Sequence, residues 1–264
     1  IKECIMVNHQ IKVLQALASA IAEGGRGVTG TAFPKQPVRA LKLYEFEGSP
    51  FCRRVREVIT LLNLDVEIYP CPKGGLKYRS IVKEIGGKLQ FPFFIDENTG
   101  DKLYESQDII HHLFKYYGKT GQTPDKFSNY PKMPYLAFAG TLLNGARGVW
   151  INKKIVNRAA PKHKLELWSF EASPYSRVVR SVLSELELPY ILHSVAKERW
   201  QDMGPAILRL KPGKYEPLKE GKREKLLPLM QGKMQVPYLV DPNTGVKMFE
   251  SAEIVKYLKK QYGS

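Results

Sequence analysis

Two copies of one short turn carry the residues best placed for chemistry. Residues 45–56 read EFEGSPFCRRVR and residues 169–180 read SFEASPYSRVVR. In each copy a Ser-Pro pair, at Ser49 and Ser173, comes directly before a helical pattern. A helix N-terminus offers free N–H groups and a partial positive charge, which stabilise a thiolate or a carboxylate. Ser followed by Pro is also an ordinary helix start, so the turn alone leaves a ligand site and a simple cap open.

Thiol exchange would need a pair of cysteine thiols, which neither turn contains. Dithiol chemistry requires a thiolate at the first position of the turn and a second thiol three residues later. Ser49 holds the first position and Cys52 the second, and the other copy has Ser176 in place of Cys52. A glutaredoxin-type reaction is therefore not expected. Cys71, in the stretch YPCPKG, is expected to be a structural thiol at a strand end.

A second pair of matching stretches follows the turns. FPFFIDENTGDKLYESQDIIHHLFKYYG (91–118) matches VPYLVDPNTGVKMFESAEIVKYLKKQYG (236–263), at an offset of 145 instead of 124, so the second copy holds about 21 extra residues. In each stretch a Glu-Ser pair opens the last helix, where it offers an acceptor for an ammonium and donors for a carboxylate. The pairs are Glu105 with Ser106, and Glu250 with Ser251.

The elements that must position these residues come in the same order in both copies. Short apolar runs at 41–46 and 165–170 indicate strands, and helical spacing follows at 50–63 and 174–187. A second strand, a second helix, a third strand and an Asn-Thr-Gly hairpin lead to the last helix. Strands joined through a helix run parallel and the terminal hairpin is antiparallel. The order β-α-β-α-β-β-α therefore predicts an α/β protein with two thioredoxin-like domains in tandem.

Both copies resemble the N-terminal, glutathione-binding domain of glutathione S-transferases and the related glutaredoxins. The resemblance covers about 41–118 and 164–263 and rests on three motifs in the same order: the Ser-Pro turn, a Pro at the third strand, and the Glu-Ser pair. The tandem arrangement is similar to plant and cyanobacterial proteins with two such domains, which in plants are usually plastid-targeted. The resemblance implies glutathione as ligand and a plastid location, although no transit peptide is visible.

The resemblance also implies a role for each motif. In the family the turn contacts the glutathione sulfur, the residue before a cis-proline pairs with the cysteinyl part, and the Glu-Ser pair holds the γ-glutamyl end. Ser49, with Cys52 one helical turn later, would be catalytic, because a serine hydroxyl can lower the pKa of the bound thiol. The implied glutathione-binding residues are Ser49, Phe91, Pro92, Glu105 and Ser106, and Ser173, Val236, Pro237, Glu250 and Ser251.

The net charge of +15 is concentrated outside the repeats. Residues 41–118 carry eleven basic and eleven acidic side chains, whereas an N-terminal arm (1–40) has a net +3 and a linker (119–162) a net +7. Domain 2 (163–264) owes its net +5 to an insertion at 197–233. Such extensions favour docking on a protein partner or an anionic membrane surface, the alternative being solvated loops. A nucleic-acid partner is not expected, because no basic face with stacking aromatics is present.

The composition suits two globular domains in a reducing compartment. The chain has 264 residues, of which 43% are apolar, and its three cysteines are too few for a disulfide framework. No segment approaches the roughly 18 uninterrupted apolar residues of a membrane span. His111 and His112 have no His or Cys at ligand spacing nearby, so no metal site is expected.

The extensions contain apolar side chains that need a surface. Residues 3–23 fit an amphipathic helix whose stripe either folds back on the chain or binds a partner. The stripe consists of Ile11, Leu14, Leu17, Ala18 and Ile21. Residues 133–150 fit a helix that braces the two domains. The insertion is too apolar for a disordered tail and is expected to be an interaction loop. Its expected anchors are Trp200, Leu208, Leu210, Tyr215, Leu226, Leu227 and Met230.

These patterns favour an interaction or accessory role, as a subunit of a plastid, thylakoid-associated complex, over catalysis. Glutathione transferases build the pocket for their second substrate from a helical domain that follows the glutathione domain. Here about 45 linker residues follow the first copy, and the sequence ends after the second. The alternative is a glutathione-dependent transferase or thiol enzyme that uses Ser49.

Overall fold

The structure confirms the order of elements predicted for both copies. The computed structural model describes residues 2–128, 135–155, 158–204 and 215–263. Domain 1 consists of β1 (Leu41–Glu45), α2 (Pro50–Leu61), β2 (Val66–Pro70), α3 (Lys77–Gly86), β3 (Phe93–Asp96), β4 (Asp101–Leu103) and α4 (Ser106–Tyr117). Domain 2 consists of β5 (Leu165–Ser169), α7 (Pro174–Glu185), β6 (Tyr190–Ser194), α8 (Lys222–Leu226), β7 (Tyr238–Asp241), β8 (Val246–Met248) and α9 (Ser251–Tyr262). Further helices are α1 (Lys2–Ala22), α5 (Asp125–Ser128) and α6 (Tyr135–Leu143), with 3-10 turns at Lys153–Ile155 and Trp200–Asp202.

A buried aspartate fixes the terminal hairpin of each domain against its last helix. At the end of β3, Asp96 accepts the backbone N–H of Asn98 at 2.8 Å and the hydroxyl of Tyr117, on α4, at 2.6 Å. In domain 2, Asp241 occupies the equivalent place and accepts from Tyr262 of α9. The Asn-Thr-Gly sequence can therefore turn tightly while the helix that follows is held on the sheet.

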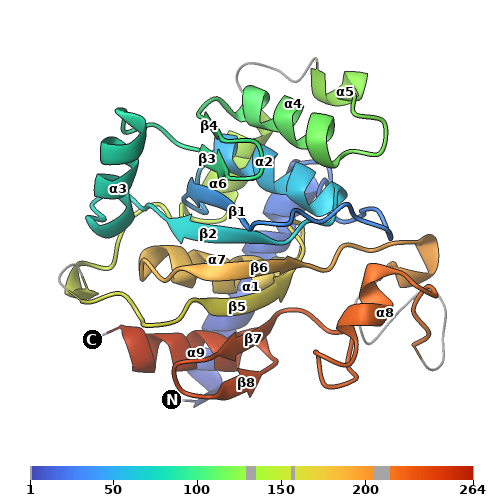
Figure 1. Ribbon diagram of the computed structural model, residues 1–264. Helices are drawn as coiled ribbons and strands as arrows, with labels where there is room; N and C mark the ends of the chain where they lie inside the picture. Colours follow the sequence, from blue (N-terminus) through green and yellow to red (C-terminus); the bar gives the residue numbers. More distant parts are fainter. Residues whose placement is uncertain (1, 129–134, 156–157, 205–214, 264) are drawn as a thin grey trace.

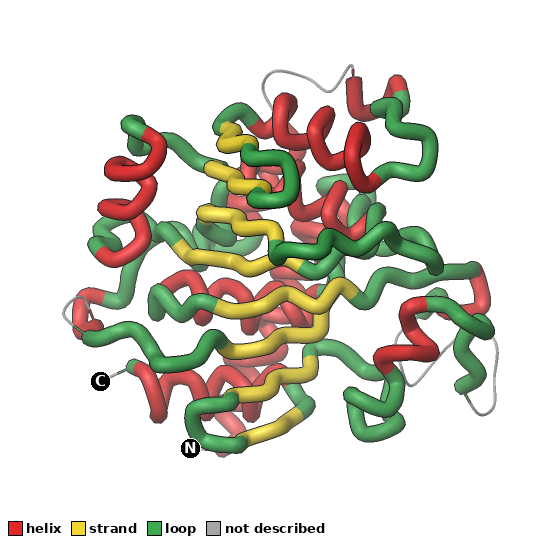
Figure 2. The backbone as a smooth tube through the Cα atoms, viewed as in Figure 1, coloured by secondary structure: helices red, strands yellow, loops and turns green. Residues whose placement is uncertain are grey.

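The two domains share one eight-stranded sheet, which the sequence did not indicate. The strand order is β4-β3-β1-β2-β6-β5-β7-β8 (Figures 1 and 2). The join is an antiparallel pair in which Val66 and Ile68 of β2 lie opposite Leu192 and Tyr190 of β6. Antiparallel pairing of equivalent strands relates the domains by a pseudo-twofold axis. The site ends of the two domains therefore point in opposite directions.

Helices cover both faces of the sheet. The main apolar core lies between the sheet and α2, α4, α7 and α9. On the opposite face α3 covers domain 1 around Tyr78 and Val82. Helices α1 and α6 form an outer layer behind α2 and α7 (Figure 1). Among the described residues, no helix is both long enough and apolar enough to cross a bilayer.

The insertion of domain 2 takes the place of α3, which corrects part of its predicted role. Four expected partner anchors instead pack against Trp168 and Tyr238 in a core cluster of domain 2: Tyr215, Leu226, Leu227 and Met230. Trp200 is exposed, as an anchor would be. Leu208 and Leu210 lie outside the described residues.

The arm and the linker form a further repeat that the sequence analysis missed. GGRGV at 24–28 follows α1, and GARGV at 145–149 follows α6. After each motif the chain crosses to the other domain: Lys197 N donates to Val28 O at 2.9 Å, and Lys73 N donates to Val149 O at 2.7 Å. The arm, which precedes domain 1, thus contacts domain 2, and the linker, which precedes domain 2, contacts domain 1. This is the arrangement of a dimer with exchanged arms.

The second glycine of these motifs allows the close approach. Gly27 and Gly148 have φ angles of +80° and +76°, which favour glycine. A Cβ atom on Gly27 would lie 2.6 Å from the Cβ of Glu171, and one on Gly148 would lie 2.8 Å from the Cβ of Glu47. Both extensions therefore press directly on the turn that precedes α7 or α2.

Helix α1 folds back on its own chain, but not through the predicted stripe. Its buried face consists of His9, Val13, Ala16, Ser19 and Ala20, which face α6 and α7. The hydroxyl of Ser19 donates to the carbonyl of Gly140 on α6 at 2.6 Å. Small residues let the two helices cross closely, whereas the larger side chains of the stripe point to solvent. The expectation that the chain itself could bury the stripe is wrong. The expected inter-domain brace is shorter than predicted, since α6 ends at Leu143.

Candidate functional site

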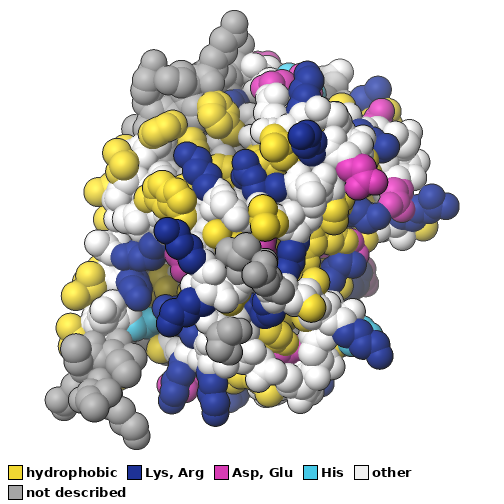
Figure 3. All heavy atoms as spheres, turned by 90° about the vertical axis from the view of Figure 1, so that its left-hand side faces the viewer, with side chains coloured by type: hydrophobic (Ala, Val, Ile, Leu, Met, Phe, Trp, Pro, Cys, Tyr) yellow, Lys and Arg dark blue, Asp and Glu magenta, His cyan; other side chains and the backbone are white. Residues whose placement is uncertain are grey.

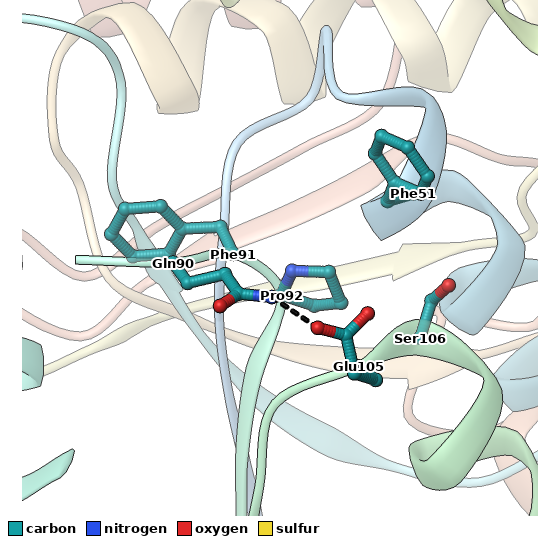
Figure 4. Close-up of a pocket in the computed structure, with 6 residues that line it drawn as sticks. All are labelled: Phe51, Gln90, Phe91, Pro92, Glu105 and Ser106. Carbon is teal, nitrogen blue, oxygen red and sulfur yellow. Dashed lines mark hydrogen bonds between the residues drawn. The ribbon is translucent and has the colours of Figure 1, made fainter. Parts of the chain in front are cut away.

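Domain 1 has a cavity where three predicted motifs meet. It has a volume of about 170 Å³ and is lined by Phe51, Gln90, Phe91, Pro92, Glu105 and Ser106. These residues come from the start of α2, the loop before β3 and the start of α4. In Figure 4, Gln90 and Phe91 lie on one side, Phe51 and Ser106 on the other, and Pro92 and Glu105 between them. The structure thus brings together four of the five residues implied for domain 1.

The loop before the third strand has the predicted cis-proline in both domains. The peptide bonds Phe91–Pro92 and Val236–Pro237 are both cis. In domain 1 the amide of Gln90 donates to the carboxylate of Glu105, as the dashed line in Figure 4 shows. This pair links the proline loop to the start of α4. Domain 2 has an equivalent pair, Gln235 and Glu250, joined at 2.6 Å.

Arg54 adds a positive charge that the sequence analysis overlooked. Its guanidinium donates to the hydroxyl of Ser106 at 3.5 Å and to the side-chain carbonyl of Gln107 at 2.8 Å. Arg54 is buried, and it lies beside the N-terminal end of α4. Arg54 does not itself line the cavity, but its charge lies directly behind the hydroxyl of Ser106 and the first N–H groups of α4, at the end of the cavity that would suit a carboxylate. The sequence does contain a signal for this charge. The two turns differ at this position, where the first has Arg54 and the second has Val178.

Ser49 and Ser173 are placed as helix caps. The hydroxyl of Ser49 accepts the backbone N–H of Cys52 at 3.3 Å, and that of Ser173 accepts the N–H of Ser176 at 3.3 Å. Both serines are buried, and Ser49 does not line the cavity. The linker covers this turn, because Thr141 Oγ1 of α6 donates to the carbonyl of Gly48 at 3.0 Å. Of the two interpretations of the turn, the geometry supports the cap.

In domain 2 the arm helix occupies the place where domain 1 has Arg54. A hydrogen bond of 2.9 Å joins Nε2 of His9, on α1, to the hydroxyl of Ser251. Val178 packs against Val13 and Ala16 of the same helix. The γ-glutamyl end implied for domain 2 is thus covered by the chain itself.

A family model described as glutathione S-transferase, N-terminal domain, matches residues 43–124 and 167–264. The two matched segments cover more than half of the chain. The chain belongs to this family. No curated protein and no solved structure matches the chain. The tandem of thioredoxin-like domains is therefore a tandem of glutathione S-transferase N-terminal domains. Within the described residues, no group of three or more His, Cys, Asp or Glu side chains could hold a metal ion.

Both described cysteines of these transferase-type domains are shielded. Burial raises the pKa of Cys52 to about 12 and that of Cys71 well above its usual value. A thiol reacts as the thiolate, so both are expected to be inert in the native protein. In a Cys4→Ser variant, we expect a chromogenic disulfide reagent to detect no thiol at neutral pH until urea unfolds the chain. Rapid reaction of a native thiol would contradict this expectation.

A buried ion cluster joins the two transferase-type domains through the turn motifs themselves. Arg56 Nε of α2 donates to Glu171 at 3.0 Å, and Arg180 Nε of α7 donates to Glu47 at 3.0 Å. Each arginine reaches the glutamate of the other domain, and all four side chains are buried. The repeated Glu and Arg of the turns were the signal for this cluster, but the sequence analysis considered only the Ser and Cys between them.

The arm completes the cluster near the pseudo-twofold axis. Glu23, just after α1, pairs with Arg53 of α2 at 2.8 Å and with Arg177 of α7 at 3.0 Å. Burial raises the pKa of Glu23, against the opposing effect of Arg53 and Arg177. The cluster therefore ties the arm, domain 1 and domain 2 into one unit.

Proposed function

We propose that domain 1 binds glutathione and that the protein is a glutathione-responsive accessory protein. The observation that supports this most is the cavity that unites Phe91, Pro92, Glu105 and Ser106. Glu105 would accept the ammonium of the γ-glutamyl group, and the start of α4 with Arg54 would receive its carboxylate. The backbone of Phe91, before the cis-proline, would pair with the cysteinyl part.

Domain 2 would have a structural role and would not bind glutathione. His9 already satisfies Ser251, and Val178 supplies no charge for a carboxylate. We therefore propose one glutathione site per chain. Catalysis of thiol exchange is not part of the proposal, because Cys52 is buried and its thiol stays protonated near neutral pH.

Calorimetry with glutathione tests the proposal directly. We expect saturable binding of one glutathione per chain. Ser106→Ala should weaken it roughly tenfold to a hundredfold, because it removes a hydrogen bond to a charged group. The matched variant Ser251→Ala should leave the affinity unchanged.

Three results would contradict the proposed site. These are the absence of heat at millimolar glutathione, a stoichiometry of two, and equal effects of the two serine variants. A circular dichroism spectrum of each variant controls for loss of the fold.

The accessory role and its location are proposed on other grounds. The net positive charge of the extensions supports docking on an acidic partner or surface. A plastid location, with association to the thylakoid side, is proposed on the resemblance to two-domain plastid proteins alone. Fractionation of the source cells with an antibody against the chain tests the location.

A further inference from the structure

The outer surfaces of α1 and α6 carry a concentration of exposed large apolar side chains. We call this surface the apolar face. It consists of Met6, Val7, Ile11, Leu14, Leu17 and Ile21 of α1, and of Phe138, Leu142 and Leu143 of α6. It includes four residues of the stripe predicted from the sequence, which the fold leaves in solvent.

Helices α1 and α6 are equivalent elements of the pseudo-twofold repeat, and both contribute exposed apolar side chains to the apolar face. Ile21 and Leu142 hold equivalent positions before the two RGV motifs, and their exposed fractions are 68% and 70%. They lie two residues after Ser19 and Gly140, where the helices cross. The apolar side chains of both helices therefore belong to one surface. Monomeric proteins rarely expose apolar patches of this extent unless the patch binds something.

The charges around the apolar face have mostly one sign. Residues 6–22 and 138–143 contain no acidic residue, and Lys12 is their one basic residue. Lys12 lies close to Lys259 and Arg147, and Glu185 is the acidic neighbour of this group. Glu23, which follows α1, is buried in its ion pairs and does not reach the surface.

Figure 3 shows this arrangement from the side. The view turns the left-hand side of Figure 1 toward the reader, so that the outer layer of α1 and α6 comes to the left-hand edge. Hydrophobic side chains gather along that edge, and Lys and Arg side chains lie next to them with few Asp or Glu among them. The apolar face thus has a basic rim.

We propose that the apolar face, with its basic rim, docks on an anionic membrane surface with α1 and α6 lying in the plane of the interface. Helices of this kind bury an apolar face at the boundary of headgroups and acyl chains, and anionic lipids attract the basic residues around it. A second copy of the chain is a poorer occupant, because a twofold contact would bring two basic rims together. The proposal does not depend on glutathione binding.

Vesicle sedimentation with the full chain tests the proposal. The probes are vesicles of phosphatidylcholine alone and vesicles that also contain phosphatidylglycerol. We expect binding to the anionic vesicles, weakened by salt, and little binding to the neutral ones. The double variant Ile21→Glu, Leu142→Glu should lower the partition coefficient roughly tenfold to a hundredfold, since two exposed apolar side chains lose their burial in the interface.

A matched control carries the same change in charge elsewhere. Val38 and Leu229 are also exposed apolar residues and lie outside the apolar face. The double variant Val38→Glu, Leu229→Glu should bind anionic vesicles as the unaltered chain does, after a small correction for net charge. Circular dichroism spectra and urea midpoints of both variants check that they are folded without testing the membrane proposal.

Each other outcome would overturn the proposal. These outcomes are the absence of binding to anionic vesicles, equal binding to neutral vesicles, and equal losses in the two double variants. A fourth outcome would also overturn the proposal. If the chain fails to bind vesicles and forms a dimer in analytical ultracentrifugation that the double variant Ile21→Glu, Leu142→Glu dissociates, a second copy of the chain is the occupant.

Discussion

Replacement of Glu171 by alanine is expected to lower the free energy of unfolding by about 3–5 kcal/mol, because it strands buried charges. The Glu171 carboxylate contacts Arg53 at 3.1 Å, Arg56 at 3.0 Å and Arg180 at 3.2 Å. Burial alone would raise its pKa, but Arg180, Arg56 and Arg53 lower the pKa of Glu171 to about 2. Without this carboxylate, guanidinium groups from both domains would lose a shared partner inside the protein. Urea unfolding monitored by circular dichroism measures the loss.

An exposed ion pair provides the control for this experiment. Lys42 pairs with Glu97 at the surface, where solvent screens the charges. Lys42→Ala is expected to shift the urea midpoint only slightly. If Glu171→Ala shifts the midpoint no more than Lys42→Ala does, the buried cluster does not hold the domains together in the way inferred here.

A second large effect on the free energy of unfolding is expected from the ionisation of Glu45. It makes the protein less stable as the pH rises, whereas the contribution of Glu171 is lost as the pH falls. Burial raises the pKa of Glu45 from 4.5 to about 7, against the opposing effect of Arg56. The folded state therefore holds a proton that the unfolded state releases at about pH 4.5. Its contribution to stability is complete below pH 4.5 and is lost as the pH rises through 7. The loss across this window is on the order of 3 kcal/mol.

The variant Glu45→Gln isolates this contribution. Glutamine resembles the protonated side chain but cannot ionise, so the variant should lose less stability than the unaltered chain between pH 4.5 and 8. Urea midpoints measured across this range give the comparison. Parallel curves for the two proteins would refute the assignment. Glu171 does not interfere, because its lowered pKa makes its contribution disappear only as the pH falls from 4.5 toward 2.

The numbers of charges in the cluster explain why one carboxyl is best protonated. Four arginines, two from α2 and two from α7, make ion pairs with five glutamates. The glutamates are Glu23, Glu45, Glu47, Glu57 and Glu171. A proton on Glu45 makes the cluster neutral. Ser169, the equivalent of Glu45 in domain 2, is neutral at every pH and accepts from Arg180.

The sequence was sufficient for the features that are local. Periodicity and turn residues located the strands and helices of both copies, and the family motifs located the cis-prolines and the residues around the cavity. Ser49 illustrates the limit, because a cap and a sulfur contact require the same residue. Only the position of its hydroxyl, bonded to the N–H of Cys52, favours the cap.

Features that depend on contacts between the copies could not be predicted in this way. Nothing in the residues of β2 or β6 says that these strands pair with each other. The sequence left open whether the stripe on α1 packs on the chain or binds a partner. The helix instead buries Ser19 and Ala16, which allow a close approach to α6 and α7. Arg56 and Arg180 look like solvent-exposed charges until the opposite domain supplies their partners.

The exchange of extensions has a consequence for the order of events during synthesis. Helix α1 is made well before its docking surface, which includes α7 and Ser251 of domain 2. At ribosomal rates the wait is on the order of tens of seconds. For that time His9 and the rest of the buried face of α1 have no finished domain to pack on. The nascent chain therefore presents a long apolar helix to chaperones or to a nearby lipid surface before the protein has acquired its final shape.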